Sequence, residues 1–186
     1  MSILKDRQFI RFVVKFLLLF GLFYLGTLAV IGLATPGGIY TPFVEKYFDY
    51  VSWIKQSLSW GARKVVSMAG YSTTMLPDYT IRTENGALIK IAMNCVGYGV
   101  YSFWAAYIIA NHGSFIKKLV WVVGGLLTLW LINVLRIGFF LLALQQRKEM
   151  PLGIDHHTWF NIVAYLFIFG MIWLYEKQQR KTTLSA

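Results

Sequence analysis

The sequence predicts an all-α integral membrane protein with about four transmembrane helices, and three observations predict this class. Of the 186 residues, 57% are hydrophobic and only 14% are charged, a composition more apolar than that of soluble domains. Several apolar runs approach or exceed the roughly 20 residues that a helix needs to cross a bilayer. Basic residues flank these runs, so the net charge of +10 indicates orientation in a membrane, and no nucleic-acid partner is expected.

Four apolar runs are expected to span the bilayer. A cleaved signal peptide would share the basic start and apolar run of the first, but its length favours a retained helix. The whole chain, 1–186, is predicted to be a single membrane domain. The expected spans cover residues about 9–34, 96–111, 119–144 and 158–174.

The basic residues also predict the orientation of the spans. A basic leader, the Lys117-Lys118 loop and a basic carboxy-terminal tail all fall on one side if the amino terminus is cytoplasmic. We therefore expect a multi-pass protein of the cytoplasmic membrane with both termini inside. Residues 35–95 then form an outer segment, because long loops cross largely regardless of their charge.

The outer segment carries two predicted elements. Thr41-Pro42 is a typical helix start, and apolar residues then recur at helical spacing, which predicts an amphipathic helix over 42–60. This helix either lies on the outer membrane surface or packs on the spans. Asn85-Gly86 between two β-prone runs predicts a hairpin over 79–92 with a type I′ turn. The hairpin serves as a structural cap, or as an edge strand for an extended peptide.

Cys95, Arg136 and His157 reach one membrane level through this topology, near the outer face. An arginine inside a span costs about 2.5–3.5 kcal/mol on insertion scales and is usually functional or paired. Alternatively, the side chain of Arg136 extends to the lipid headgroups at the outer face. Asn133 lies one turn before Arg136 on the same helix face, and His156 adjoins His157. Topology alone brings these residues to one level and does not show contact.

A lone cysteine is most often a small buried hydrophobe. Beside a histidine and a cation it also meets the requirements of a nucleophile, because these neighbours favour the thiolate. The cation can stabilise the oxyanion, and the histidine can protonate the leaving amine. With one cysteine in the chain, a CxxC redox pair is excluded, and no cofactor or metal is expected. A transporter is disfavoured because the chain shows no internal repeats.

The order and spacing of these residues resembles the exosortase/archaeosortase family over roughly Gly86 to Tyr175. The resemblance implies a multi-spanning membrane cysteine transpeptidase. Such enzymes cleave secreted proteins at a carboxy-terminal signal, made of a short motif, one transmembrane helix and a basic tail, and transfer them to an acceptor. The segments that carry the resemblance are Asn94-Cys95-Val96-Gly97, Asn133-Val134-Leu135-Arg136-Ile137 and the His157 that opens the last span.

The resemblance implies that Cys95, Arg136 and His157 are the catalytic residues. With four spans the chain is similar to the short forms of Gram-negative bacteria, which implies an inner-membrane protein with its site facing the periplasm. Membrane lipids and signal-bearing substrates are the implied partners, and the acceptor stays open. A non-catalytic scaffold of an export or surface-polymer system is the alternative. Possible supporting residues are His156, Asn133, Asn161 (where the family usually has glycine), Asp155 and Asn94.

Overall fold

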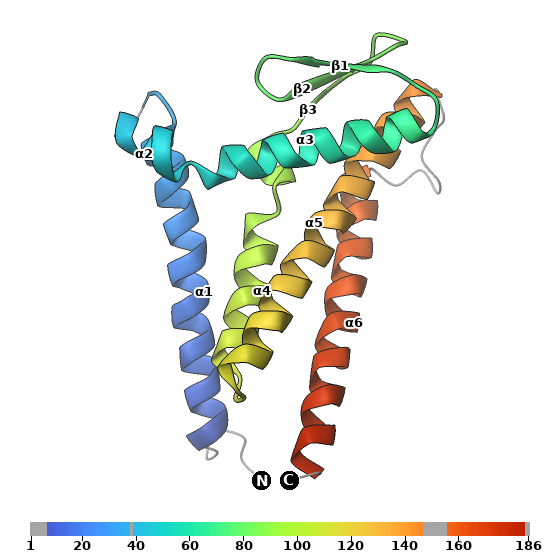
Figure 1. Cartoon of the computed structure of the whole chain (residues 1–186). Coiled ribbons are helices and arrows are strands. Elements are labelled where there is room, and N and C mark those ends of the chain that lie inside the picture. Colours follow the sequence, from blue (N-terminus) through green and yellow to red (C-terminus); the bar gives the residue numbers. More distant parts are fainter. Residues whose placement is uncertain (1–6, 38, 147–155, 185–186) are drawn as a thin grey trace. The chain divides into compact units, whose positions relative to one another are not determined.

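The computed structural model describes residues 7–37, 39–146 and 156–184, without the side chains of 94, 156–161, 164 and 181–184 (Figure 1). The chain divides into two compact units. Unit 1 comprises Met1–Asp49, Tyr98–Leu127 and Lys181–Ala186, and unit 2 comprises Tyr50–Gly97 and Thr128–Arg180.

The fold is mostly helical, with one small antiparallel sheet, as the predicted class requires. The helices are α1 (Arg7–Ala34), α2 (Pro42–Phe48), α3 (Tyr50–Met68), α4 (Tyr98–Ala110), α5 (Phe115–Gln145) and α6 (His156–Leu184). The strands are β1 (Thr73–Leu76), β2 (Thr80–Thr83) and β3 (Leu88–Lys90), and a 3₁₀ helix, η2, covers Met93–Cys95.

Within the described residues, two helices are long and apolar enough to cross a membrane, α1 and α5. The other two predicted spans are weaker. Helix α4 has 13 residues and is therefore about 20 Å long, shorter than the hydrocarbon thickness. Helix α6 has 29 residues, but charged side chains occupy its last part. Length and composition thus support two of the four predicted spans.

Unit 1 is held by aromatic packing between α1 and α4. Four aromatic residues of α1 follow each other at four-residue spacing and stack along one face, which is the face a helix presents to a neighbour. Phe16 contacts Phe103 edge-on, with ring centroids 5.4 Å apart. Tyr24 contacts Tyr98 at 5.5 Å. The four stacked residues of α1 are Phe12, Phe16, Phe20 and Tyr24.

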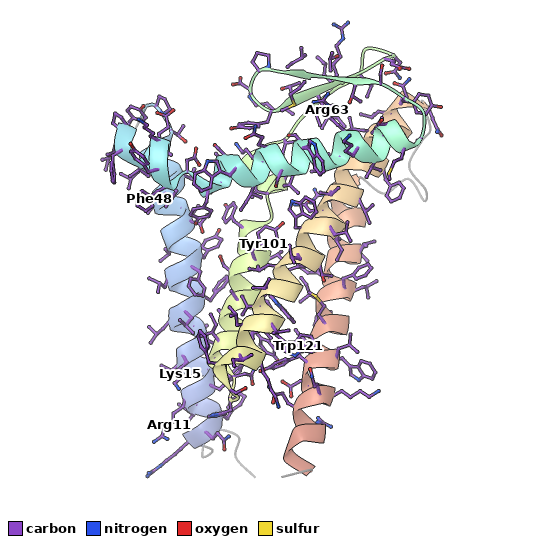
Figure 2. All side chains as sticks on the ribbon, in the orientation of Figure 1. Arg11, Lys15, Phe48, Arg63, Tyr101 and Trp121 are labelled. Atoms are coloured by element: carbon purple, nitrogen blue, oxygen red, sulfur yellow. The ribbon has the colours of Figure 1, made fainter. Side chains whose placement is uncertain are left out.

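The opposite face of α1 is apolar and exposed. Leu18 and Leu22 are 69% and 66% exposed. Leucines at this density on an open surface are typical of contact with lipid rather than with water. Arg11 and Lys15 stand near the amino-terminal end of the same helix (Figure 2), where basic residues flank membrane spans.

A second contact in unit 1 depends on the absence of a side chain at Gly125. The indole Nε1 of Trp104, which is fully buried, donates a 3.0 Å hydrogen bond to the carbonyl of Trp121. The indole lies where a side chain of Gly125 would begin, because a Cβ there would be 1.9 Å from Nε1. Gly125 therefore allows the indole to reach a carbonyl of α5.

The core of unit 2 is formed by α3, the sheet and the carboxy-terminal part of α5. Leu58, Ile81 and Leu141, one from each, are fully buried together. Two glycines allow α3 and α5 to approach closely. A Cβ on Gly61 would lie 2.7 Å from a methyl carbon of Val134, and a Cβ on Gly138 would lie 2.7 Å from Val65.

The amphipathic helix predicted over 42–60 is two helices, because the backbone at Asp49 leaves the helical region (φ −77°, ψ 62°). Thr41 and Pro42 do begin α2, although the Thr41 hydroxyl makes no capping hydrogen bond. Helix α3 continues to Met68 and buries its apolar face within unit 2. The structure thus favours the packed arrangement for that face over the membrane surface.

The predicted hairpin is present as β2 and β3, and β1, which the sequence did not predict, adds to it in the order β1-β2-β3. The type I′ turn is wrong: Gly86 has φ +87°, but Asn85 is not among the residues with positive φ. Asn85 instead donates its amide to the carbonyls of Leu144 and Gln145 at 2.9 and 3.1 Å. It thereby caps the carboxy-terminal end of α5.

We expect Gly125→Ala to destabilise the protein by about 1–3 kcal/mol, the usual cost of overpacking, because its methyl group would displace the Trp104 indole. Gly124→Ala is the matched control, since no atom lies within 4 Å of its added Cβ. Thermal unfolding in detergent measures both variants. A Gly125→Ala protein that unfolds at the same temperature as Gly124→Ala would contradict this packing.

Candidate functional site

Cys95 ends the 3₁₀ helix that joins β3 to α4. Its backbone N–H donates to the carbonyl of Ala92 at 3.0 Å, and the N–H of Val96 donates to Met93 at 3.1 Å. Two residues later Gly97 has φ +78°, a left-handed conformation that glycine adopts at little cost. The Cys-x-Gly spacing therefore has a local cause: the turn that carries Cys95 needs glycine at its end.

Asn133 of α5 holds this turn in place. Its side-chain Nδ2 donates to the carbonyl of Cys95 at 2.7 Å and to the carbonyl of Val96 at 3.2 Å. Two acceptors fix the orientation of the amide, because an oxygen at this position would face two other oxygens. The predicted supporting residue Asn133 and the predicted nucleophile Cys95 are thus joined directly within unit 2.

The other end of the Asn133 amide is a buried acceptor. The residue is 8% exposed, and its Oδ1 has no hydrogen-bond partner among the described residues. Buried polar atoms in native proteins are nearly always paired, so such an atom needs an explanation. The Asn133 amide therefore bonds through its nitrogen alone within the described part of the chain.

The Cys95 thiol is free and partly buried, and its side chain packs against the edge of the unit 2 core. It is therefore fixed by apolar contacts on one side and by backbone hydrogen bonds on the other.

Arg136 lies one helical turn after Asn133, about 4.5 Å further along α5 toward its carboxy-terminal end. Its side chain is half-buried and has an interaction of its own, so it is not a free charge. The residue is nine positions before the end of α5 at Gln145, or roughly 13 Å along the axis. Helical spacing places Arg136 and Asn133 on one face of α5.

His156 and His157 open α6, as the sequence predicts for the start of the last span. Their side chains and that of Asn161 lie outside the described part of the chain, as does the side chain of Asn94. Asp155 lies outside the described residues altogether. The backbone of His157 belongs to the same unit as Cys95 and Arg136, and its contact with either residue stays a prediction.

No group of three or more potential His, Cys, Asp or Glu metal ligands occurs among the described residues. The chain matches no protein-family model, and neither curated proteins nor solved structures gave a match.

Sequence reasoning missed the link between Asn133 and the Cys95 carbonyl, although it named both residues. The signal was available in part, because a buried asparagine inside an apolar helix must find hydrogen-bond partners. The sequence could not tell that these partners are backbone carbonyls of a turn 37 and 38 residues away.

We expect Asn133→Asp to perturb the site more than Asn133→Ala. Alanine removes the donor from two carbonyls, at a cost of about 1–3 kcal/mol, whereas aspartate places an acceptor against both. Because Cys95 is the single cysteine of the chain, its rate of alkylation reports the order of this turn. An Asn133→Asp protein with wild-type stability and alkylation rate would show that the amide does not hold the turn.

Proposed function

We propose that the chain is a membrane cysteine peptidase or transpeptidase of the exosortase type, which cleaves carboxy-terminal sorting signals at the outer face of the cytoplasmic membrane. The observation that carries the proposal is the fixation of Cys95. A buried asparagine amide holds the turn of the chain's single cysteine and presents a buried acceptor beside it. The same helix face carries Arg136 one turn further along.

In the proposed reaction the Cys95 thiol gives its proton to His157, and the thiolate sulfur attacks the carbonyl carbon of the scissile peptide bond. A tetrahedral oxyanion forms. Its collapse restores the carbonyl, breaks the C–N bond and leaves a thioester on Cys95, while His157 returns the proton to the leaving amine. An acceptor amine or water then attacks the thioester and regenerates the thiol.

Arg136 and Asn133 have separate roles in this scheme. The guanidinium of Arg136 stabilises the oxyanion or orients the substrate, and electrostatic stabilisation of an oxyanion is strong in a site that excludes water. The Nδ2 of Asn133 holds the carbonyls of Cys95 and Val96 and so keeps the turn that carries the thiol in one position relative to α5. Asp155, His156 or Asn161 orients His157.

The proposed topology has four spans, with both termini in the cytoplasm and Cys95 on the outer side. The two helices that meet the length and composition of spans are α1 and α5, and the positive-inside rule supports their orientation. Helix α4 is short enough that its ends would reach the interface only if the bilayer thins locally. The charged end of α6 would lie in the cytoplasm.

The alternative is a non-catalytic membrane scaffold of an export or surface-polymer system. In that case Asn133 only stabilises the fold, and the Cys95 side chain serves as a small apolar group. The two candidates differ in whether the Cys95 sulfur reacts.

The test is intact-mass analysis of a secreted reporter that ends in a candidate motif, one transmembrane helix and a basic tail, co-expressed with the full chain. We expect Cys95→Ala to abolish cleavage. Arg136→Gln and His157→Ala should slow it by about 10²-fold or more, because each removes one group that acts in the transition state.

His112→Ala is the control for His157→Ala, because His112 lies between α4 and α5, where the proposed topology places it on the cytoplasmic side. Normal processing by Cys95→Ala, Arg136→Gln and His157→Ala alike would reject the enzyme and favour the scaffold.

A further inference from the structure

A polar cleft of about 590 Å³ lies between the carboxy-terminal half of α3 and the start of the sheet, wholly within unit 2. Its volume is in the range of small-molecule sites. None of its residues takes part in the site around Cys95. Its lining includes Trp60, Arg63, Lys64, Ser72, Thr73 and Glu84.

One wall of the cleft carries two cations. Arg63 lies between α3 and the sheet (Figure 2), where its Nε and Nη2 donate to the hydroxyl and the carbonyl of Thr73 at 3.2 and 3.3 Å. These bonds hold the guanidinium plane and leave Nη1 without an acceptor among the described residues. The Lys64 ammonium stands 6.0 Å from the centre of the Trp60 ring. A fixed guanidinium and an ammonium that line the same cleft are suited to bind a phosphate.

The cleft also carries one carboxylate, Glu84. The N–H and the hydroxyl of Ser72 both donate to its Oε1, at 2.7 and 2.5 Å. These two hydrogen bonds lower the pKa of Glu84, so the carboxylate is ionised at neutral pH. Glu84 forms no ion pair with Arg63 or Lys64, although all three line the cleft. Such a carboxylate disfavours a purely anionic ligand and favours one that also carries a cation.

The surface of α3 around the cleft has the character of a membrane interface. Trp53 and Trp60 are 58% and 60% exposed, and their seven-residue spacing places them on one face of the helix. This face lies opposite the buried residues Leu58 and Ala62. Exposed tryptophans with adjacent basic residues gather at the headgroup level of bilayers.

We propose that this cleft binds the zwitterionic headgroup of a phospholipid with a phosphodiester and a primary amine, of which phosphatidylethanolamine is the type. Arg63 and Lys64 bind the phosphodiester, Glu84 accepts hydrogen bonds from the ammonium, and Trp60 contacts the glycerol and the upper acyl chains. The lipid anchors α3 and the sheet at the outer interface. This inference is independent of any chemistry at Cys95.

The test measures lipid binding to the full chain in detergent by native mass spectrometry, with phosphatidylethanolamine, phosphatidylglycerol and phosphatidylcholine of identical acyl chains. The wild-type protein should bind phosphatidylethanolamine roughly fivefold more tightly than the other two, the size expected for one exposed charge pair. Phosphatidylglycerol has no cation for Glu84, and the quaternary ammonium of phosphatidylcholine has no N–H to donate.

Three variants separate the parts of the cleft. Glu84→Gln should abolish the preference for phosphatidylethanolamine over phosphatidylglycerol, because the repulsion of the anionic lipid is removed. Lys64→Gln should weaken the binding of both lipids. This substitution leaves the contacts of Arg63 with Thr73 intact. Lys90→Gln is the matched control, because Lys90 is exposed in the same unit and pairs with Asp78 outside the cleft.

The proposal is overturned if Glu84→Gln retains the wild-type preference, or if Lys64→Gln binds both lipids as the wild type does. A competition experiment uses soluble glycerophosphoethanolamine. At equal concentration it should not displace phosphatidylethanolamine, because it lacks the acyl chains that Trp60 contacts in the proposal. Displacement at equal concentration would assign the cleft to a soluble ligand and would also overturn the proposal.

Discussion

The hydrogen bonds from the Asn133 amide to the carbonyls of Cys95 and Val96 are the constraint on which the candidate site depends. They join a short turn to helix α5, whose part in unit 2 begins at Thr128. A second link acts at the far end of the same segment, where Asn85 of the hairpin caps the last carbonyls of α5. Asn133 and Asn85 thus fix the chain around β3 to one helix at two points. Gly61 and Gly138 let α3 pack closely on that helix, so the turn is held by polar bonds and supported by a close-packed core.

Much of the fold could be predicted from the sequence, because long apolar runs and an Asn-Gly turn are strong local signals. The helices, the hairpin and the place of Cys95 directly after it follow from such signals. Three features could not be predicted, since each depends on a tertiary contact. The break at Asp49 interrupts a continuous amphipathic pattern, and β1 pairs with β2 without a strong pattern of its own. The Asn85 side chain joins the turn to α5, because its Oδ1 accepts hydrogen bonds from Thr83 and Ala87 while its Nδ2 donates to the last carbonyls of α5.

The candidate site, like the fold, could be predicted only in part. Residue type and topology were enough to select Cys95, Arg136 and Asn133, because polar groups in apolar segments are costly and need a reason. Sequence alone could not show that the amide of Asn133 faces the turn, nor that its Oδ1 is buried with no partner among the described residues. The cleft lined by Arg63 and Glu84 escaped sequence reasoning because its cations come from α3 and its carboxylate from the residue that follows β2. Both sites lie in unit 2, which contains the turn of Cys95 and the cleft between α3 and the sheet.

The central proposal is that His157 reaches the thiol of Cys95, the residue whose backbone carbonyl Asn133 holds. A disulfide tests this contact directly, because it forms only when the two Cβ atoms approach within about 3.5–4.5 Å. His157→Cys gives the chain a second cysteine beside Cys95, and His156→Cys is the matched control. After mild oxidation of the membrane-embedded full chain, intact mass should show loss of two hydrogen atoms in His157→Cys and an unchanged monomer in His156→Cys. An intramolecular bond formed by His156→Cys alone would contradict the claim.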